Sequence, residues 1–203
     1  IVMEFIEGAD AYKLLKRIDA RPARIPLDLC AYVVSEVCQG LDYAHRKRDM
    51  SGVPLDIVHR DISPGNVLVG WDGSVKLADF GIARAHGREE STEAGVTKGK
   101  MSYMAPEQAL GMPLDPRADV HALGCTLHAL LTGRSPLRGT DLGRRLVERL
   151  DPELDPSIPE QVAAIIRRAT YFDRTRRYET AESMAAAIEQ ALGTQDPRGP
   201  FLK

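Results

Sequence analysis

Two carboxylates and one amide lie close together in the first half of this 203-residue chain. Asn66 follows Asp61 by five positions, and Asp79 follows Asn66 by thirteen. Mg²⁺ prefers oxygen ligands, so a carboxylate and an amide suit it, while a separate carboxylate can take a proton from a hydroxyl group. If Asn66 and Asp79 hold one cation and Asp61 faces an incoming hydroxyl, the three side chains suit the transfer of a phosphoryl group.

The residues between Asn66 and Asp79 predict a short β-hairpin. Apolar runs at 67–69 and 75–77 flank Asp72-Gly73, which is a two-residue turn signal. A hairpin folds the chain back on itself. We therefore expect its two ends, and with them Asn66 and Asp79, to converge.

These segments resemble the catalytic core of a bacterial Hanks-type serine/threonine protein kinase, and they read Ile57-Val-His59-Arg60-Asp61-Ile-Ser63-Pro-Gly-Asn66 and Asp79-Phe80-Gly81. The resemblance implies that Asp61 orients the acceptor hydroxyl and takes its proton, and that Asn66 and Asp79 bind Mg²⁺ beside ATP. His59 and Phe80 are expected to pack and to hold the two loops together. A lone aspartate in a loop is usually a turn former, but three motif residues in family order and spacing favour the kinase interpretation.

The resemblance also implies where ATP binds. Residues 1–6 are expected to form a buried strand that runs into the hinge between two kinase lobes. Met3 would be the gatekeeper beside the adenine pocket, and the backbone of Glu4 and Ile6 would bond the adenine edge. Asp10 would contact the ribose, although a core strand followed by a helix cap is an equally good interpretation of these residues. The nucleotide-binding residues implied in this way are Met3, Glu4, Ile6, Asp10, Leu68 and Asp79.

Two long helices are predicted to build the body of the domain. Apolar residues at helical spacing after Pro26 predict an amphipathic helix, and a second run is apolar on most sides and should be buried. By resemblance, Asp119 at the start of the second helix holds the backbone of the catalytic loop, and Thr132-Gly133 ends this helix. The positions that carry the two patterns are Leu27, Ala31, Val34, Cys38 and Leu41, and then Val120, Leu123, Gly124, Leu127, Leu130 and Leu131.

Residues 79–107 resemble the activation segment of a kinase, which ends here in Ala105-Pro106-Glu107. A loop of this length is usually functional. Arg60 would order the segment, once phosphorylated, through charge-assisted hydrogen bonds. Arg177, in a closing pattern near the end of the chain, would form an ion pair with Glu107. The candidate phosphorylation sites are Ser91, Thr92 and Thr97.

Two positions depart from the family pattern. Most serine/threonine kinases have a lysine two residues after the catalytic aspartate, where this chain has Ser63. They usually have a threonine after the glycine of the substrate-facing loop, where this chain has Lys100. We expect Lys100 to supply the missing cation near the γ-phosphate, with Ser63 completing the hydrogen bonding; alternatively, Lys100 points to solvent and Ser63 caps a turn. Ser63 also weakens the preference for serine and threonine over tyrosine as the acceptor.

The composition fits one globular domain. With 43% hydrophobic and 28% charged residues, the chain can bury a sizeable core. Its net charge of −2 gives no electrostatic reason to expect a nucleic-acid partner, and no apolar run is long enough to span a membrane. Cys30, Cys38 and Cys125 fall in predicted helices, which favours reduced, buried thiols and a cytoplasmic location.

A metal site is the alternative interpretation of one helix face. His121, Cys125 and His128 share a face of the second helix and suggest zinc. A structural zinc site needs four ligands, and no fourth is visible in the sequence. We therefore expect these three side chains to serve ordinary packing.

The expected fold class is α+β and mainly helical, a protein-kinase-like large lobe with a short β-hairpin and without the small β-rich lobe. Residues 1–8 would be the last small-lobe strand and the hinge. Residues 9–192 would be the large lobe, with its catalytic loop at 57–66, and residues 193–203 a linker or truncated tail. The chain is then expected to be a fragment, inactive by itself, that needs the missing lobe of the same polypeptide.

Three functions remain open. The favoured one is an ATP- and Mg²⁺-dependent kinase that phosphorylates serine or threonine in protein substrates, in bacterial signalling. A pseudokinase-like scaffold is less favoured because Asp61, Asn66 and Asp79 are intact. A small-molecule phosphotransferase shares the same constellation, but Ala105-Pro106-Glu107 and Arg177 are typical of a platform for protein substrates.

Overall fold

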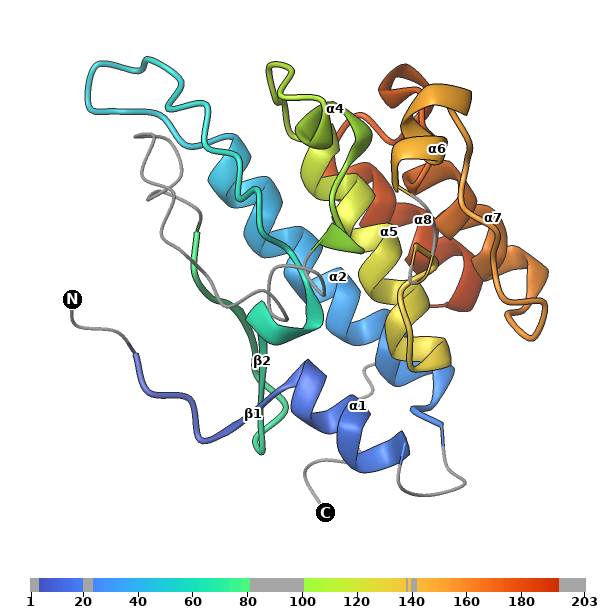
Figure 1. Cartoon of the computed structure of the whole chain (residues 1–203). Coiled ribbons are helices and arrows are strands. Elements are labelled where there is room, and N and C mark those ends of the chain that lie inside the picture. The colour runs from blue at the N-terminus through green and yellow to red at the C-terminus, as the bar shows by residue number, and fades with distance from the viewer. Residues whose placement is uncertain (1–3, 20–23, 81–100, 138, 140–141, 194–203) are drawn as a thin grey trace, which may run out of the picture.

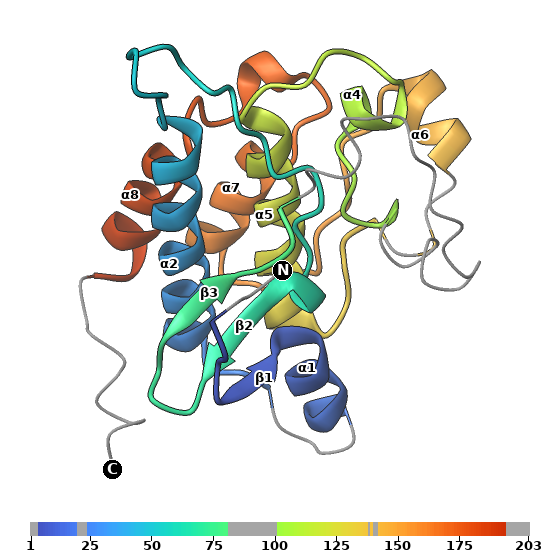
Figure 2. The same cartoon turned by 90° about the vertical axis from the view of Figure 1, so that its left-hand side faces the viewer.

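The structure, a computed structural model, describes residues 4–19, 24–80, 101–137, 139 and 142–193. A body of helices carries a small antiparallel sheet at one end (Figures 1 and 2). This arrangement confirms the predicted α+β, mainly helical class. The elements are β1 (Gly8–Asp10), α1 (Ala11–Asp19), α2 (Leu27–His45), η1 (Pro64–Asn66), β2 (Val67–Gly70), β3 (Val75–Leu77), α4 (Pro106–Ala109), α5 (Arg117–Thr132), α6 (Leu142–Glu148), α7 (Glu160–Ala169), η3 (Arg174–Arg176) and α8 (Ala181–Leu192).

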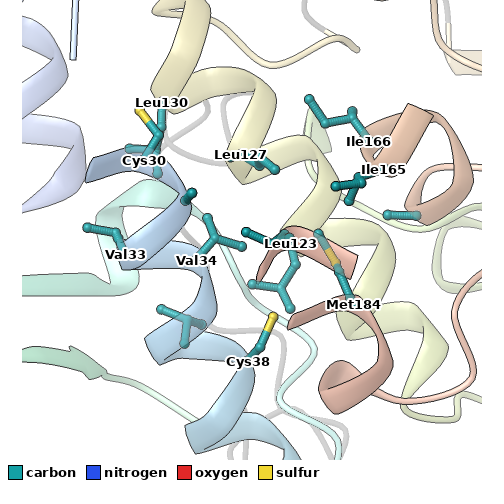
Figure 3. Packing of buried hydrophobic residues seen from close by; sticks show 14 of the residues in the cluster. Cys30, Val33, Val34, Cys38, Leu123, Leu127, Leu130, Ile165, Ile166 and Met184 are labelled. Carbon is teal, nitrogen blue, oxygen red and sulfur yellow. The ribbon is translucent and has the colours of Figure 1, made fainter. Parts of the chain in front are cut away.

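The two predicted long helices form and make the core. α2 begins directly after Pro26 and packs against both α5 and α8, while α7 packs against α5. Every residue from Ala118 to Leu131 is buried, which confirms that α5 is a central helix, and Gly133 ends it with a positive φ of 80°. Figure 3 shows Val34 of α2, Leu123 of α5 and Met184 of α8 converging on one apolar interior.

The hairpin confirms the predicted fold-back but not the predicted turn. β2 pairs with β3 in the register Val67↔Leu77, Leu68↔Lys76 and Val69↔Val75. The Gly70 N–H donates to Ser74 O at 2.8 Å and the Gly73 N–H donates to Gly70 O at 3.0 Å, so the loop has three residues and not two. Gly73 takes a positive φ of 83° at its last position, which is the usual geometry of a three-residue hairpin loop.

The predicted buried strand at residues 1–6 is wrong for the residues that the structure describes. Residues 4–6 are irregular, and Phe5 is 87% exposed. The strand forms later, at β1, which pairs antiparallel with β2. A strand needs a neighbouring backbone for its hydrogen bonds, and among the described residues β2 offers this neighbour to 8–10 and not to 4–6.

No helix in the described ranges is both long and apolar enough to cross a membrane.

The close approach of α5 and α7 generates a stability prediction. A Cβ atom on Gly124 would lie 2.7 Å from Ala169 Cβ and 2.8 Å from Thr170 Cγ2. The Gly124→Ala variant should therefore lose about 1–3 kcal/mol of unfolding free energy through overpacking, as urea unfolding would measure.

Gly40 is the matched control, because it lies in α2 and a Cβ there would meet nothing within 4 Å. Gly40→Ala should be neutral or stabilise the fold by up to about 1 kcal/mol, since alanine favours a helix over glycine. Equal effects of the two substitutions would contradict the packing argument.

Candidate active site

A buried carboxylate on α5 holds the backbone of the catalytic loop. Asp119 is 1% exposed, and its two oxygens accept hydrogen bonds from the His59 N–H at 2.8 Å and the Arg60 N–H at 2.9 Å. Its Oδ2 atom also lies 2.8 Å from Nε2 of His45, at the end of α2. The predicted role of Asp119 is confirmed, and His45 is a partner that the sequence did not reveal.

The catalytic loop contains a strained residue that is held from both sides. Arg60 has a positive φ of 69°, a region that residues other than glycine seldom adopt. Asp119 binds its N–H, and Gln108 Nε2 donates to its carbonyl at 2.7 Å. These two bonds fix the peptide that leads into Asp61, so strain here sets the direction of the next side chain.

Asp61 and Asn66 are brought together by the turn between them. Asn66 is buried, and its Nδ2 atom donates to Asp61 O at 2.6 Å and lies 3.3 Å from Asp61 Oδ2. Because the amide nitrogen faces Asp61, the side-chain oxygen of Asn66 is the atom left for a cation.

The hairpin carries Asp79 to the same place. The Ala78 N–H donates to Asn66 O at 2.9 Å, so Asp79 comes directly after a residue that is bonded to Asn66. Asp79 is exposed and has a positive φ of 58°. The predicted convergence of Asn66 and Asp79 therefore holds for the backbone.

His59 and Phe80 connect the two loops, as predicted. Their ring centroids lie 4.6 Å apart, and His59 Nε2 lies 3.0 Å from Ala78 O. Since a carbonyl only accepts, Nε2 carries the ring proton, and Nδ1 accepts from the Asp61 N–H at 3.3 Å. Burial lowers the pKa of His59, which keeps the ring neutral in this role.

Two of the candidate nucleotide-binding residues are neighbours in the sheet. Asp10 of β1 is the cross-strand partner of Leu68 of β2. Asp10 also caps α1, because its Oδ1 accepts from the Lys13 N–H at 2.8 Å and its Oδ2 lies 2.9 Å from Lys13 Nζ. Burial opposes the charge of Asp10, but the bonds and charge of Lys13 outweigh it and lower the pKa of this carboxyl. The structure thus shows the cap, and a ribose contact stays a prediction.

For the remaining candidate residues the structure shows only their burial or a local contact, or they lie outside the described residues. Glu4 is exposed and lies 3.5 Å from Lys76 Nζ in a surface ion pair, and Ile6 is half-buried. Ser63 is buried and begins η1, but its side chain makes no capping hydrogen bond to that turn. The candidates that fall outside the described residues are Met3, Ser91, Thr92, Thr97 and Lys100.

Comparison with known proteins places this geometry in a family. The family described as the protein kinase domain matches residues 1–188. The chain belongs to the protein kinase family. The fold agrees, because the crystal structure of the PknI kinase domain of Mycobacterium tuberculosis matches 95% of this chain and 65% of that chain, with a TM-score of 0.68 and 27% identity.

Bacterial kinases are among the relatives. The chain is 41% identical to the tyrosine-protein kinase MasK of Myxococcus xanthus, over 100% of this chain and 33% of that protein. It is 35% identical to the serine/threonine-protein kinase PrkC of Bacillus subtilis, over 95% of this chain and 29% of that protein. The kinase segment described here thus spans about a third of the length of these two relatives.

The donor atoms of this kinase segment fit Mg²⁺. Protein kinases generally use ATP and Mg²⁺. Asn66 and Asp79 present an amide oxygen and a carboxylate, which form a hard, all-oxygen set that leaves room for phosphate oxygens and water. Mg²⁺ bound there would neutralise charge on the phosphates of ATP.

A buried ion pair holds Glu107, at the end of the segment that resembles a kinase activation segment. Arg177 Nη1 lies 2.6 Å from Glu107 Oε1, Nη2 lies 2.9 Å from Oε2, and both side chains are buried. The guanidinium also donates to the backbone oxygens of Arg117, Tyr171 and Phe172. The predicted pair is confirmed, and its burial means that loss of either partner would leave an uncompensated charge.

The side chains on the face of α5 that suggested a zinc site make other contacts. His121 Nε2 lies 3.1 Å from the guanidinium of Arg145, and His128 Nδ1 lies 2.8 Å from the backbone oxygen of Arg134. Burial raises the pKa of Cys125 to about 12, so its thiol stays protonated. Within the described ranges, no group of three potential ligands could hold a metal ion.

Sequence reasoning missed His45, Gln108 and Arg145. Each contacts a residue that is distant in the sequence, and no fixed spacing pointed to these partners. Gln108 directly follows Ala105-Pro106-Glu107, but its bond to the Arg60 carbonyl spans 48 positions. The only local signal was the place of His45 in the last turn of a predicted helix, where a cation is favoured. That signal does not reveal a partner.

Acidification is expected to destabilise this kinase lobe. Burial is the main cause that lowers the pKa of His59 and His128 below 6.5 and that of His121 well below it. In the unfolded chain these rings gain a proton near pH 6.5, whereas in the folded chain they do so at lower pH, so the unfolded state binds more protons in between. The unfolding free energy should therefore fall as the pH drops below 6.5, by at most about 1.4 kcal/mol per pH unit for each histidine.

Urea unfolding from about pH 7.5 to about pH 5.5 at constant ionic strength measures this loss. A His128→Gln variant removes one of the three rings and should show a shallower dependence. A stability that is constant over this range would show that the three rings do not remain neutral in the folded chain.

Proposed function

We propose that this chain is the catalytic large lobe of an ATP- and Mg²⁺-dependent protein kinase that phosphorylates serine or threonine in protein substrates. The observation that carries the proposal is the anchored catalytic loop, in which Asp119 and Gln108 fix the backbone before Asp61. Serine/threonine kinases among the relatives support the acceptor class.

The chain's own residues would act in sequence. Asn66 and Asp79 would hold the cation beside the ATP phosphates, while Asp61 orients the acceptor hydroxyl and takes its proton. Asn66 has a second task, because its amide nitrogen donates to the Asp61 carbonyl and lies 3.3 Å from Asp61 Oδ2, so that it restrains both the backbone and the carboxylate of Asp61. The role of Lys100 as a substitute cation near the γ-phosphate stays a prediction, as does that of Ser63.

Tyrosine specificity is the second candidate. MasK carries the name of a tyrosine-protein kinase and shares 41% identity with the whole chain. Ser63 stands where most serine/threonine kinases have a lysine, which agrees with a departure in acceptor choice. Both hypotheses use the same phosphoryl-transfer site and differ in the acceptor alone.

A cytoplasmic location is part of the proposal. Cys30, Cys38 and Cys125 are buried free thiols, and burial raises the pKa of each to about 12. Protonated, buried thiols are typical of proteins that stay in a reducing compartment.

The catalytic prediction concerns Asp61. In the full-length protein, Asp61→Asn keeps the side-chain size but cannot take a proton, so transfer of phosphate from ATP to dephosphorylated casein with Mg²⁺ should slow by about 10²–10⁴-fold. Asp72→Asn is the matched control, since Asp72 is exposed in the hairpin loop and should leave the rate unchanged.

Phosphoamino-acid analysis of the labelled casein then decides the acceptor. Phosphoserine or phosphothreonine supports the first candidate, and phosphotyrosine alone supports the second. Equal rates for Asp61→Asn and the unmodified protein would contradict both candidate functions.

Control by the activation segment yields a separate prediction. Arg60 is half-buried beside the catalytic aspartate, where its guanidinium could meet a phosphate on the segment. A triple alanine variant of Ser91, Thr92 and Thr97 in the full-length protein should therefore transfer phosphate more slowly than the unmodified protein. Phosphatase treatment of the unmodified protein should lower its rate to the same level. Full activity of the triple variant would contradict phosphorylation control.

A further inference from the structure

Three consecutive cations follow α2 and line a hollow on the surface. The hollow has a volume of about 350 Å³, and all the residues that line it are exposed. No candidate catalytic, nucleotide-binding or metal-binding residue is among them. The lining residues are Gln39, Tyr43, Arg46, Lys47 and Arg48.

Two of these cations have no carboxylate partner in the part of the chain that the structure describes. Arg46 forms an ion pair with Asp42, and the negative end of α2 also favours a cation at this position. Lys47 Nζ instead donates to the Tyr43 hydroxyl at 2.6 Å, and Arg48 Nη1 donates to a backbone oxygen at 2.8 Å. The hollow therefore carries two positive charges that no neighbouring carboxylate compensates.

The chain beyond the hollow projects from the end of α2 as a hairpin at residues 47–55 (Figure 1). The Leu55 N–H donates to Lys47 O at 3.0 Å, and the Asp49 N–H donates to Val53 O at 2.9 Å. The Asp49 carboxylate accepts from two more N–H groups in the turn. Val53 and Leu55 are nevertheless exposed. Grouped apolar side chains on a hydrogen-bonded projection are typical of a binding surface, and ordering it costs little on association.

The hollow and the 47–55 hairpin together fit an acidic peptide. Because Leu55 is opposed to Lys47, an exposed apolar side chain lies next to an uncompensated cation. Side-chain carboxylates can enter a concave site and reach Lys47 and Arg48, whereas a flat lipid surface meets only its rim. An extended peptide that carries both acidic and apolar residues would therefore satisfy both parts of the surface.

We propose that the hollow and the 47–55 hairpin form a docking site for an extended, acidic segment of another protein. Carboxylates of the segment pair with Lys47 and Arg48, and its apolar side chains pack on Tyr43 and Leu55. None of these four residues belongs to the proposed phosphoryl-transfer site, so the docking site does not depend on the proposed function.

A fluorescein-labelled peptide of repeated Glu-Glu-Leu-Leu units tests the site in the full-length protein without ATP. In an extended peptide alternate side chains share a face, so this repeat presents glutamate and leucine on both faces. It contains no hydroxyl acceptor, so phosphoryl transfer cannot contribute to the signal. Fluorescence anisotropy should show binding that weakens as salt is added. Lys47→Gln combined with Arg48→Gln should raise the Kd by about tenfold, since each exposed ion pair contributes up to about fivefold.

Lys16→Gln combined with Arg17→Gln is the matched control. Lys16 and Arg17 form the same exposed pair of cations, in the last turn of α1. Lys16 Nζ lies 4.6 Å from the ring centroid of Tyr12, and Lys47 Nζ lies 4.7 Å from that of its own tyrosine. Neither control residue lines the hollow, so the Kd should stay within about twofold. Equal losses in the two double variants, or no peptide binding at all, would overturn the docking site.

Charge reversal tests the electrostatic part of the site. Lys47→Glu combined with Arg48→Glu should lose the acidic peptide and bind a peptide of repeated Lys-Lys-Leu-Leu units instead. A reversed variant that still prefers the acidic peptide would contradict the pairing.

The apolar part of the site has its own test. Leu55→Gln should raise the Kd for the acidic peptide by about fivefold through lost apolar contact. Leu110→Gln should not change it, because Leu110 is exposed to a similar degree, 51% against 48%, and lies outside the surface. Equal effects of the two substitutions would remove Leu55 from the site.

Two other occupants would also overturn the proposal. If phosphatidylserine vesicles bind the unmodified protein but not the Lys47→Gln, Arg48→Gln variant, and the peptide does not bind, the surface belongs to a membrane. If sedimentation shows a dimer that this variant loses, again without peptide binding, the occupant is a second copy of the chain.

Discussion

The catalytic loop depends on one buried carboxylate. Asp119 lies in α5, the most deeply buried helix described, and it binds two successive N–H groups of the loop and the ring of His45. A buried carboxylate is tolerated when its oxygens are satisfied, so the loop and the carboxylate stabilise each other. Because α5 is packed on all sides, it gives the loop a rigid base against which the strained backbone of Arg60 can be held.

The rest of the candidate site is connected to this loop by further hydrogen bonds. Asn66 binds the Asp61 backbone, the hairpin returns the chain, and Ala78 binds the backbone of Asn66. His59 connects this hairpin to Asp119. Its ring contacts Phe80 and the Ala78 oxygen, and its backbone N–H donates to Asp119. The elements that would bind the cation and the acceptor hydroxyl are thus connected by hydrogen bonds that each involve a backbone group, so they can move little relative to one another.

The segment that contains Glu107 is anchored to the same helix by different chemistry. The Glu107–Arg177 pair and the contact between Arg145 and His121 both bury charge near α5. The first is a bidentate pair with further carbonyl acceptors, so its charges are compensated within the lobe. One central helix therefore holds both the loop before Asp61 and, through Arg177, the segment that contains Glu107.

Local patterns in the sequence were enough to predict α2 and α5, because each helix carries its own apolar spacing and its own end signals. They also predicted the hairpin, although the loop has one residue more than the Asp72-Gly73 signal suggests. A two-residue type I′ turn needs a positive φ at both central residues, and here only Gly73 has one, while Asp72 does not. The resemblance to kinases supplied the proposed roles of Asp61, Asn66 and Asp79, and the role of Asp119 that the structure confirms, because these residues stand at characteristic spacings. Burial of the Glu107–Arg177 pair was not readable from the sequence, since burial is a property of packing.

Tertiary structure alone decided which distant groups meet. Residues 4–6 have strand-like composition but are irregular, because a strand exists only where another backbone pairs with it, and β1 forms at 8–10 instead. No local pattern pointed to the partners of His45, Gln108 and Arg145, each of which contacts a residue far along the chain. The sequence by itself determined the family and the two long helices, because the motif spacings and the apolar patterns are local. The fold determined how these residues are held, because hydrogen bonds and burial between distant segments depend on packing.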